Sequence, residues 1–182
     1  MERTLVSANA GKSAVMCCDP SLAAFGFVVM QGMSILSKGC IKTETGGKKL
    51  RIRKGDDRVR RVTEINVVLL KHIRKYNVQY IFAELPHGSQ SAAAAMALGL
   101  ATSIVQTISD TLEIGLEWYS EADSKRALLG KNTAAKDETI KATGKIYSIQ
   151  WSGIKYKDEA IADSLSIHNV AVKKSQILKL LK

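Results

Sequence analysis

The stretch that decides the fold runs from residue 13 to residue 41 and reads SAVMCCDPSLAAFGFVVMQGMSILSKGCI. Its apolar and β-branched runs predict three strands, at 13–18, 24–30 and 33–41. The last two are joined by Gln31 and Gly32 alone, and a two-residue link with glycine is typical of a β-hairpin. The chain is therefore expected to open with three neighbouring antiparallel strands.

Helices and strands alternate after this meander. Residues 42–61 carry nine Lys or Arg against three acids and predict a basic loop that runs into a helix. A helix is expected at Asp57–Lys75, because apolar residues recur there every three or four positions: Val59, Val62, Ile65, Leu69 and Ile73. Asp56 or Asp57 is expected to cap its start, and Asn77 is expected to close it. The later expected elements are a strand at 78–83, a helix at 90–109, a strand at 112–119, helices at 121–129, 134–143 and 158–172, and a basic, apolar tail at 173–182.

This order predicts an α/β fold with a mixed five-stranded sheet flanked by helices. It resembles the RNase H-like layout, in which a meander of strands precedes parallel crossovers. Residues 1–12 are polar and rich in small side chains, and we expect a flexible leader there. The sequence has no internal repeat and no low-complexity linker, so residues 13–182 are expected to form a single domain.

Composition narrows the class of protein. Of 182 residues, 27 are Lys or Arg and 17 are Asp or Glu, and the resulting net charge of +10 suits a polyanionic partner. The odd cysteine count (Cys17, Cys18 and Cys40) and the absence of a Cys-x-x-Cys pair favour reduced thiols, a cytoplasmic location and no zinc ribbon. No signal-like leader is seen, and no apolar run nears the roughly 20 residues of a membrane span. We therefore expect no membrane association, although the alanine-rich stretch 91–105 is weakly polar.

Two acids stand at the ends of predicted core strands. Asp19 follows the run 13–18, and Glu84 follows the run 78–83. An acid before proline is also a common turn former, so Asp19 alone has two readings, whereas Glu is a poor turn former. Ligand sites of parallel sheets lie at the carboxyl ends of the strands. Asp19 and Glu84 are therefore candidates to meet within metal-binding distance.

The last predicted helix offers three further acids. Glu159 and Asp163 are four residues apart and share a face. An acidic helix start explains Asp158 and Glu159 well, but it explains Asp163, next to apolar neighbours, poorly. Carboxylates are the ligands that Mg²⁺ and Mn²⁺ prefer, and two such ions about 3.5–4 Å apart can promote phosphodiester hydrolysis. Four acids in a basic chain predict a nuclease.

Four blocks of the chain, in order, resemble the RuvC family of Holliday junction resolvases over about residues 15–170. The first is Asp19-Pro20 with Gly26 in the next strand. The second is Glu84 followed by Leu98-Gly99-Leu100-Ala101. The third is Lys125 and Gly130 with Ala134 and Lys136, and the fourth is Ala162-Asp163-Ser164-Leu165-Ser166-Ile167.

The resemblance implies roles for individual residues. Asp19, Glu84 and Asp163 would be catalytic metal ligands for Mg²⁺ or Mn²⁺, with two ions per active site. The family places its remaining acid or histidine three residues before the last Asp, where this chain has Ala160, so Glu159 is preferred over Asp158 as the fourth ligand. His87 stands where the family often has an aromatic residue that probes the junction centre. Lys125, Lys131 and Lys136 would neutralise phosphates near the cut.

The basic segment supplies further candidates for contacts to the DNA backbone, which position DNA without reading its sequence. They are Arg51, Arg53, Lys54, Arg58, Arg60 and Arg61.

The expected protein is a homodimer that nicks opposing strands of a four-way junction, paired through the small-residue face of the helix 90–109. Three alternatives stay open. The first is an RNase H-fold nuclease that cuts hybrids or flaps, and the second is a non-catalytic nucleic-acid-binding protein, which Ala160 keeps in play. The third is an actin-like ATPase domain, for whose second lobe the chain is too short.

Overall fold

A computed structural model describes residues 13–46, 52–89 and 91–180. The expected leader 1–12, Arg51 and Gln90 lie outside the described residues. At the centre is one five-stranded sheet with the order β3-β2-β1-β4-β5. Its strands are β1 (Ala14–Asp19), β2 (Ala24–Gln31), β3 (Ser34–Lys42), β4 (Val78–Leu85) and β5 (Gly115–Ser120). β2 runs antiparallel to β1 and β3, whereas β4 pairs parallel to β1 and to β5. The expected mixed sheet is confirmed.

The hairpin between β2 and β3 is confirmed with a shift of one residue. Gln31 still belongs to β2 and pairs with Ser34, so the connecting residues are Gly32 and Met33. Gly32 has a positive φ of 56°, which a residue without a Cβ adopts at little cost. Glycine at the first linking position thus closes the hairpin.

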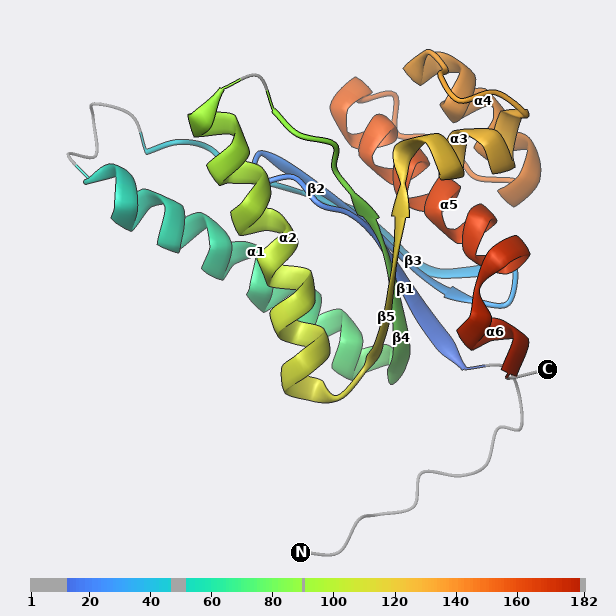
Figure 1. The fold of residues 1–182 in the computed structure, drawn as a ribbon, viewed down its shortest axis with the longest axis horizontal. Helices are drawn as coiled ribbons and strands as arrows, with labels where there is room; N and C mark the ends of the chain where they lie inside the picture. Colours follow the sequence, from blue (N-terminus) through green and yellow to red (C-terminus); the bar gives the residue numbers. More distant parts are fainter. Residues whose placement is uncertain (1–12, 47–51, 90, 181–182) are drawn as a thin grey trace, which may run out of the picture.

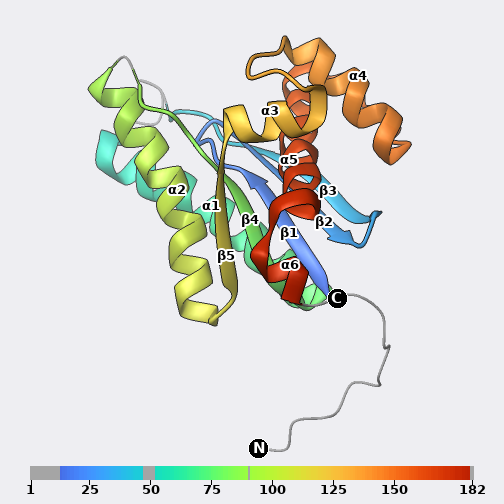
Figure 2. The same cartoon turned by 45° about the vertical axis from the view of Figure 1, so that its right-hand side comes forward.

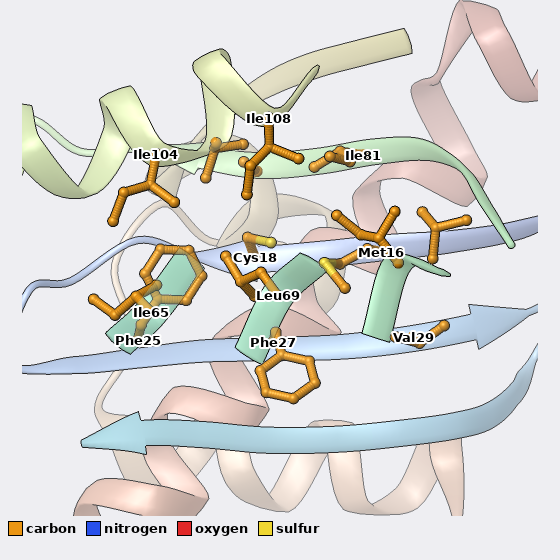
Figure 3. Packing of buried hydrophobic residues seen from close by; sticks show 14 of the residues in the cluster. Met16, Cys18, Phe25, Phe27, Val29, Ile65, Leu69, Ile81, Ile104 and Ile108 are labelled. Carbon is orange, nitrogen blue, oxygen red and sulfur yellow. The ribbon is translucent and has the colours of Figure 1, made fainter. Parts of the chain in front are cut away.

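One face of the sheet is covered by α1 (Lys54–Tyr76) and α2 (Ala92–Leu112), as Figure 1 shows. Ile65, Leu69 and Ile73 of α1 and Ile104 and Ile108 of α2 are buried in this layer. Figure 3 shows several of these side chains meeting Met16, Phe25 and Ile81 of the sheet. Burial of such side chains contributes about 1.5–3 kcal/mol each, so this core is what orders the strands beneath it.

Two details of α1 differ from the expectation. The helix begins at Lys54, preceded by Arg53, and no side chain caps it. Asp57 instead accepts hydrogen bonds from the backbone of Gly46 and from Arg60, so it ties a loop to the helix. Val59 is 66% exposed and points away from the core, because it lies across the helix from Asp57 and Arg61, which are buried. The closing position Asn77, in the left-handed region at φ 50°, is confirmed.

The other face carries α3 (Glu121–Leu129), α4 (Lys136–Tyr147), α5 (Lys155–Lys174) and α6 (Gln176–Leu180). The tail after residue 173 thus contains a short helix that the sequence did not predict. It is held where Glu117 of β5 accepts hydrogen bonds from the Ser175 hydroxyl and the Ile177 backbone N–H. Residues Ala160–Ala171 of α5 are all buried. This helix is the core of the second layer.

Gly26 sets how closely α5 approaches the sheet. It pairs with Asp19 across the β1–β2 ladder. A Cβ atom built on Gly26 would lie 2.8 Å from the Ala160 carbonyl carbon and 2.8 Å from the Ser164 hydroxyl oxygen, and closer still to the Ala160 carbonyl oxygen. The absence of a side chain therefore lets the α5 backbone rest directly on β2, opposite the end of β1.

Helix α2 is longer than expected. It continues to Leu112, and by length and composition it is the one helix within the described ranges that is apolar enough to cross a membrane. The expectation that no run of this kind exists was wrong, because the alanine-rich stretch extends through Ile104, Val105 and Ile108. Those residues are buried against the sheet.

Candidate active site

Asp19 and Glu84 end two adjacent parallel strands. The register pairs Cys18 with Ala83, so the next residue of each strand is the acid, and the two acids lie side by side. Asp163 comes from α5, which crosses β1 and β2 at this end of the sheet. Asp163 lies near both acids, because its charge raises the pKa of Asp19 and of Glu84.

Burial makes this cluster costly to ionise. It raises the pKa of Asp19 to about 7, with Asp163 and Glu121 adding to the rise and Lys136 opposing it. It raises the pKa of Glu84 to about 8, again with contributions from Asp19, Asp163 and Glu121. The pKa of Asp163 is raised by burial too, against the effect of Lys136. Buried carboxylates with raised pKa values are characteristic of catalytic and metal-binding sites.

Two lysines bring positive charge into the cluster. The Lys136 ammonium donates to Asp163, and although burial works against its charge, Asp163, Asp19 and Glu84 raise its pKa. The Lys125 ammonium donates to Glu121 on the same helix. The side chain of Lys125 is only 11% exposed, so its charge interacts with the carboxylates of the cluster and little with solvent. Two of the three lysines expected near the cut are therefore part of this site.

Asp158 and Glu159, the two candidates for the fourth ligand, stand at the start of α5. Asp158 accepts hydrogen bonds from the Ser152 backbone and hydroxyl and from the Gly153 backbone, which closes the loop before the helix. These contacts explain its low pKa and its burial without a metal. Asp158 is thus engaged by the loop before the helix, whereas Glu159 is half-buried one turn before Asp163.

Glu121 was missed. It is the first residue of α3, next to the end of β5, and it was named from the sequence only as the start of an expected helix. The available signal was its place at the end of a predicted strand, the same signal that singled out Asp19 and Glu84. Exposed His87, in the loop after β4, acts on the pKa of Glu121 and so lies on the same side of the site.

The basic residues of α1 differ in what they can do. Arg53 pairs with Asp56, and exposed Lys54 and Arg58 line a groove whose other wall is Ala93 and Ala97 of α2.

Arg60 and Arg61 are engaged within the chain. Arg60 binds Asp57, Glu64 and the Glu44 carbonyl, and buried Arg61 donates to the Thr43 hydroxyl and the Leu22 carbonyl. Arg61 therefore holds the loop after β3, and the expected DNA contact is corrected to a structural role. Lys131 pairs with Glu138 on the surface.

The donor set suits a divalent cation, since it consists of carboxylates that lack full solvation. Within residues 13–46, 52–89 and 91–180, however, no three Asp, Glu, His or Cys side chains converge closely enough to enclose an ion as they stand. Lysine ammonium groups pair with the carboxylates instead. Side-chain rotations at the rim are thus needed for the cluster to close around a metal, as is common in ligand-free sites.

A mixed five-stranded sheet in this order, flanked by helices, is the RNase H-like fold. Within that class, the chain belongs to the family of crossover junction endodeoxyribonucleases RuvC, whose model matches residues 15–171. It is accordingly a metal-dependent endodeoxyribonuclease that resolves Holliday junctions in DNA recombination and repair.

Solved structures agree on the fold. Thermus thermophilus RuvC in complex with a Holliday junction substrate is 19% identical, with a TM-score of 0.70 over 88% of this chain and 93% of that one. A second Thermus thermophilus RuvC structure gives a TM-score of 0.68 at 19% identity, covering 90% and 96%. The yeast mitochondrial Holliday junction resolvase Ydc2 gives 0.62 at 14% identity, covering 88% and 78%. No curated protein matches the chain.

Proposed function

We propose that Asp19, Glu84 and Asp163 hold the divalent metal, Mg²⁺ or Mn²⁺ and two ions per site, with which the enzyme cuts a four-way DNA junction. The observation that carries this proposal is the convergence of the three acids, from β1, β4 and α5, at one end of the sheet with raised pKa values. Bound metal would activate water and stabilise the leaving oxygen of the phosphodiester.

The residues of the chain have distinct parts in this proposal. The three carboxylates orient the metal at the end of β1. Lys136, half exposed and paired with Asp163, is placed to exchange that carboxylate for a phosphate oxygen when DNA arrives. Lys54 and Arg58 in the groove between α1 and α2, and His87 on the loop after β4, are the exposed candidates for holding the arms and centre of the junction.

The test is cleavage of matched labelled substrates with Mg²⁺ or Mn²⁺: a four-way junction, a plain duplex and an RNA–DNA hybrid. Symmetric paired nicks in the junction alone are the expected result. Cleavage of the hybrid alone would favour the alternative of a hybrid nuclease. Tight binding without cleavage would favour a non-catalytic role for this fold.

Metal binding is expected to release protons and to strengthen as pH rises. Asp19 and Glu84, with pKa values raised to about 7 and about 8, are largely protonated just below neutrality, and a cation binds only their ionised forms. Affinity for Mg²⁺ should therefore increase through this window and level off above both pKa values. Calorimetric titrations at about pH 6.5 and about pH 8.5, each in two buffers of different ionisation enthalpy, measure both quantities. Equal affinity at both pH values without proton release contradicts the prediction.

We also propose that the protein is an intracellular homodimer, that residues 13–182 form one domain, and that α2 pairs two copies. The apolar character of α2 supports the pairing of two copies, because only 28% of its most apolar window is buried within one chain. Met96 is 51% exposed there, beside exposed Ala95 and Gly99. An exposed apolar helix face is typical of a protein–protein contact. Two copies related by a two-fold axis would present two active sites to opposing strands of a junction.

Gly99→Arg is expected to convert the dimer to a monomer. Nothing within 4 Å would meet a Cβ at Gly99, so the fold of one chain accepts the new side chain, and any effect must come from a second copy. Light scattering after gel filtration measures the mass. Gly55→Arg, at another open helical glycine, is the matched control and is expected to keep the dimer. A monomeric wild type, or an unchanged mass for Gly99→Arg, would contradict pairing through α2.

A further inference from the structure

We propose that Glu121 is the fourth carboxylate of the metal site, a role that rests on the proposed function of Asp19, Glu84 and Asp163. Its position follows from the strand register. Tyr119 and Ser120 of β5 pair with Glu84 and Leu85 of β4, and Glu121 comes next. Three adjacent parallel strands thus carry an acid at or just beyond the same end: Asp19 is the last residue of β1, Glu84 is the last but one of β4, and Glu121 follows β5. Figure 2 shows the start of α3 at this end of β5, beside α5.

Glu121 shares its electrostatic environment with all three other acids. Its charge adds to the rise in the pKa of Asp19, of Glu84 and of Asp163. Coulomb interactions of this kind require short separations, because solvent screens distant charges. Asp158 is tied to the Ser152–Gly153 loop by hydrogen bonds, whereas Glu121 directly follows β5, the strand that pairs with the one carrying Glu84.

The cluster already contains two positive charges. The Lys125 ammonium pairs with Glu121 and the Lys136 ammonium pairs with Asp163. Lys125 is nearly buried for a lysine, which is costly unless its charge is needed there. These ammonium groups are internal counter-ions at the carboxylates where a divalent ion would bind.

The side chain of Glu121 is able to move. It is 44% exposed at the rim of the site, and its contact to Lys125 lies within one helical turn of α3. The hydrogen bond from Lys125 keeps the pKa of Glu121 low, in contrast to the raised values of its neighbours. A rotation of this side chain away from Lys125 would bring its carboxylate toward a cation held by Asp19 and Glu84.

Binding of Mn²⁺ to the DNA-free protein, followed by electron paramagnetic resonance, separates this role from a merely structural one. Glu121→Gln is expected to weaken Mn²⁺ binding by at least about tenfold. Lys125→Met is expected to leave it equal or stronger, because the competing ammonium is gone. If Glu121 serves only to position Lys125, both Glu121→Gln and Lys125→Met will weaken junction binding and leave the Mn²⁺ affinity unchanged. That result would overturn the proposal.

Two controls make the outcome specific. Glu138→Gln removes an exposed glutamate that also pairs with a lysine, Lys131, and Glu159→Gln removes the candidate on α5; both are expected to bind Mn²⁺ as the wild type does. Asp19→Asn distinguishes the two levels of inference. If wild type and Asp19→Asn bind Mn²⁺ alike, the proposed metal site fails altogether. If Asp19→Asn loses the ion and Glu121→Gln keeps it, the site stands and the assignment of Glu121 is wrong.

Discussion

Asp19→Asn is expected to abolish junction cleavage while junction binding persists. Asparagine keeps the shape of the side chain at the end of β1 but removes the charge that holds the metal. Loss of a group that only orients a metal ligand costs about 10–100-fold, so loss of the ligand itself is expected to cost at least about 1000-fold in rate. Single-turnover cleavage of a labelled four-way junction measures the effect, and a gel-shift assay in Ca²⁺ measures binding.

The same substitution is expected to stabilise the metal-free protein. The pKa of Asp19 is raised to about 7, so above that pH the folded state carries a buried charge that the unfolded chain carries in water. Removing it should raise the unfolding midpoint by a few degrees, since ~1 kcal/mol corresponds to about 2–4 °C at this length. Asp110→Asn, at an exposed acid near the far end of α2, is the matched control. An Asp19→Asn variant that cleaves normally, or that melts lower without metal, contradicts the assignment.

Gly26→Ala is expected to damage stability and catalysis together. The added methyl group meets the Ala160 backbone of α5, which cannot step aside as a flexible side chain would. Overpacking of this kind costs typically about 1–3 kcal/mol, and rigid backbone on the other side places this case at the upper end. Relief requires α5 to move away from β2 and to carry Asp163 with it. Because a displacement of about 1 Å can cost ~100-fold in rate, we expect a loss of that order.

Urea unfolding and cleavage, both at a temperature where the variant is fully folded, measure the two effects. Gly55→Ala is the matched control, because a Cβ there meets nothing within 4 Å and the residue lies in α1. Its stability is expected to be unchanged or raised by up to about 1 kcal/mol, since alanine favours a helix over glycine. A Gly26→Ala variant that is as stable and as active as Gly55→Ala would show that α5 does not rest on β2 as described.

Much of the fold could be predicted because local patterns and tertiary structure agree. The meander was legible from short apolar runs and a glycine link, and α3 from Glu121 to Leu129 matches the expected range. The errors arose where a residue serves a distant contact. Val59 was counted in the apolar stripe of α1, but the buried stripe there passes through Asp57 and Arg61, which bind the loop after β3. Helix α6 depends on Glu117, about 60 positions earlier in the chain, and no local pattern signals that contact.

The candidate site likewise contains residues that could be predicted from the sequence and residues that could not. Asp19, Glu84 and Asp163 are acids in apolar surroundings, which is a local anomaly that a sequence reveals. Arg61 and Asp158 look like ordinary surface charges in sequence, yet each closes a loop by contacts to backbone carbonyl or N–H groups. Glu121 at a helix start is ordinary by sequence alone. Only the parallel register of β4 and β5 places it beside Glu84.

Helix α5 gives the enzyme one wall that does not yield. From Ala160 to Ala171 every residue is buried, so Asp163 stands on the same scaffold that holds the second layer together. The opposite wall, with exposed His87 after β4 and partly exposed Glu121 and Lys136 at the starts of α3 and α4, has side chains that are free to rotate. Adaptation to DNA substrates of differing geometry must therefore come from the side of the site with His87, Glu121 and Lys136, and not from α5.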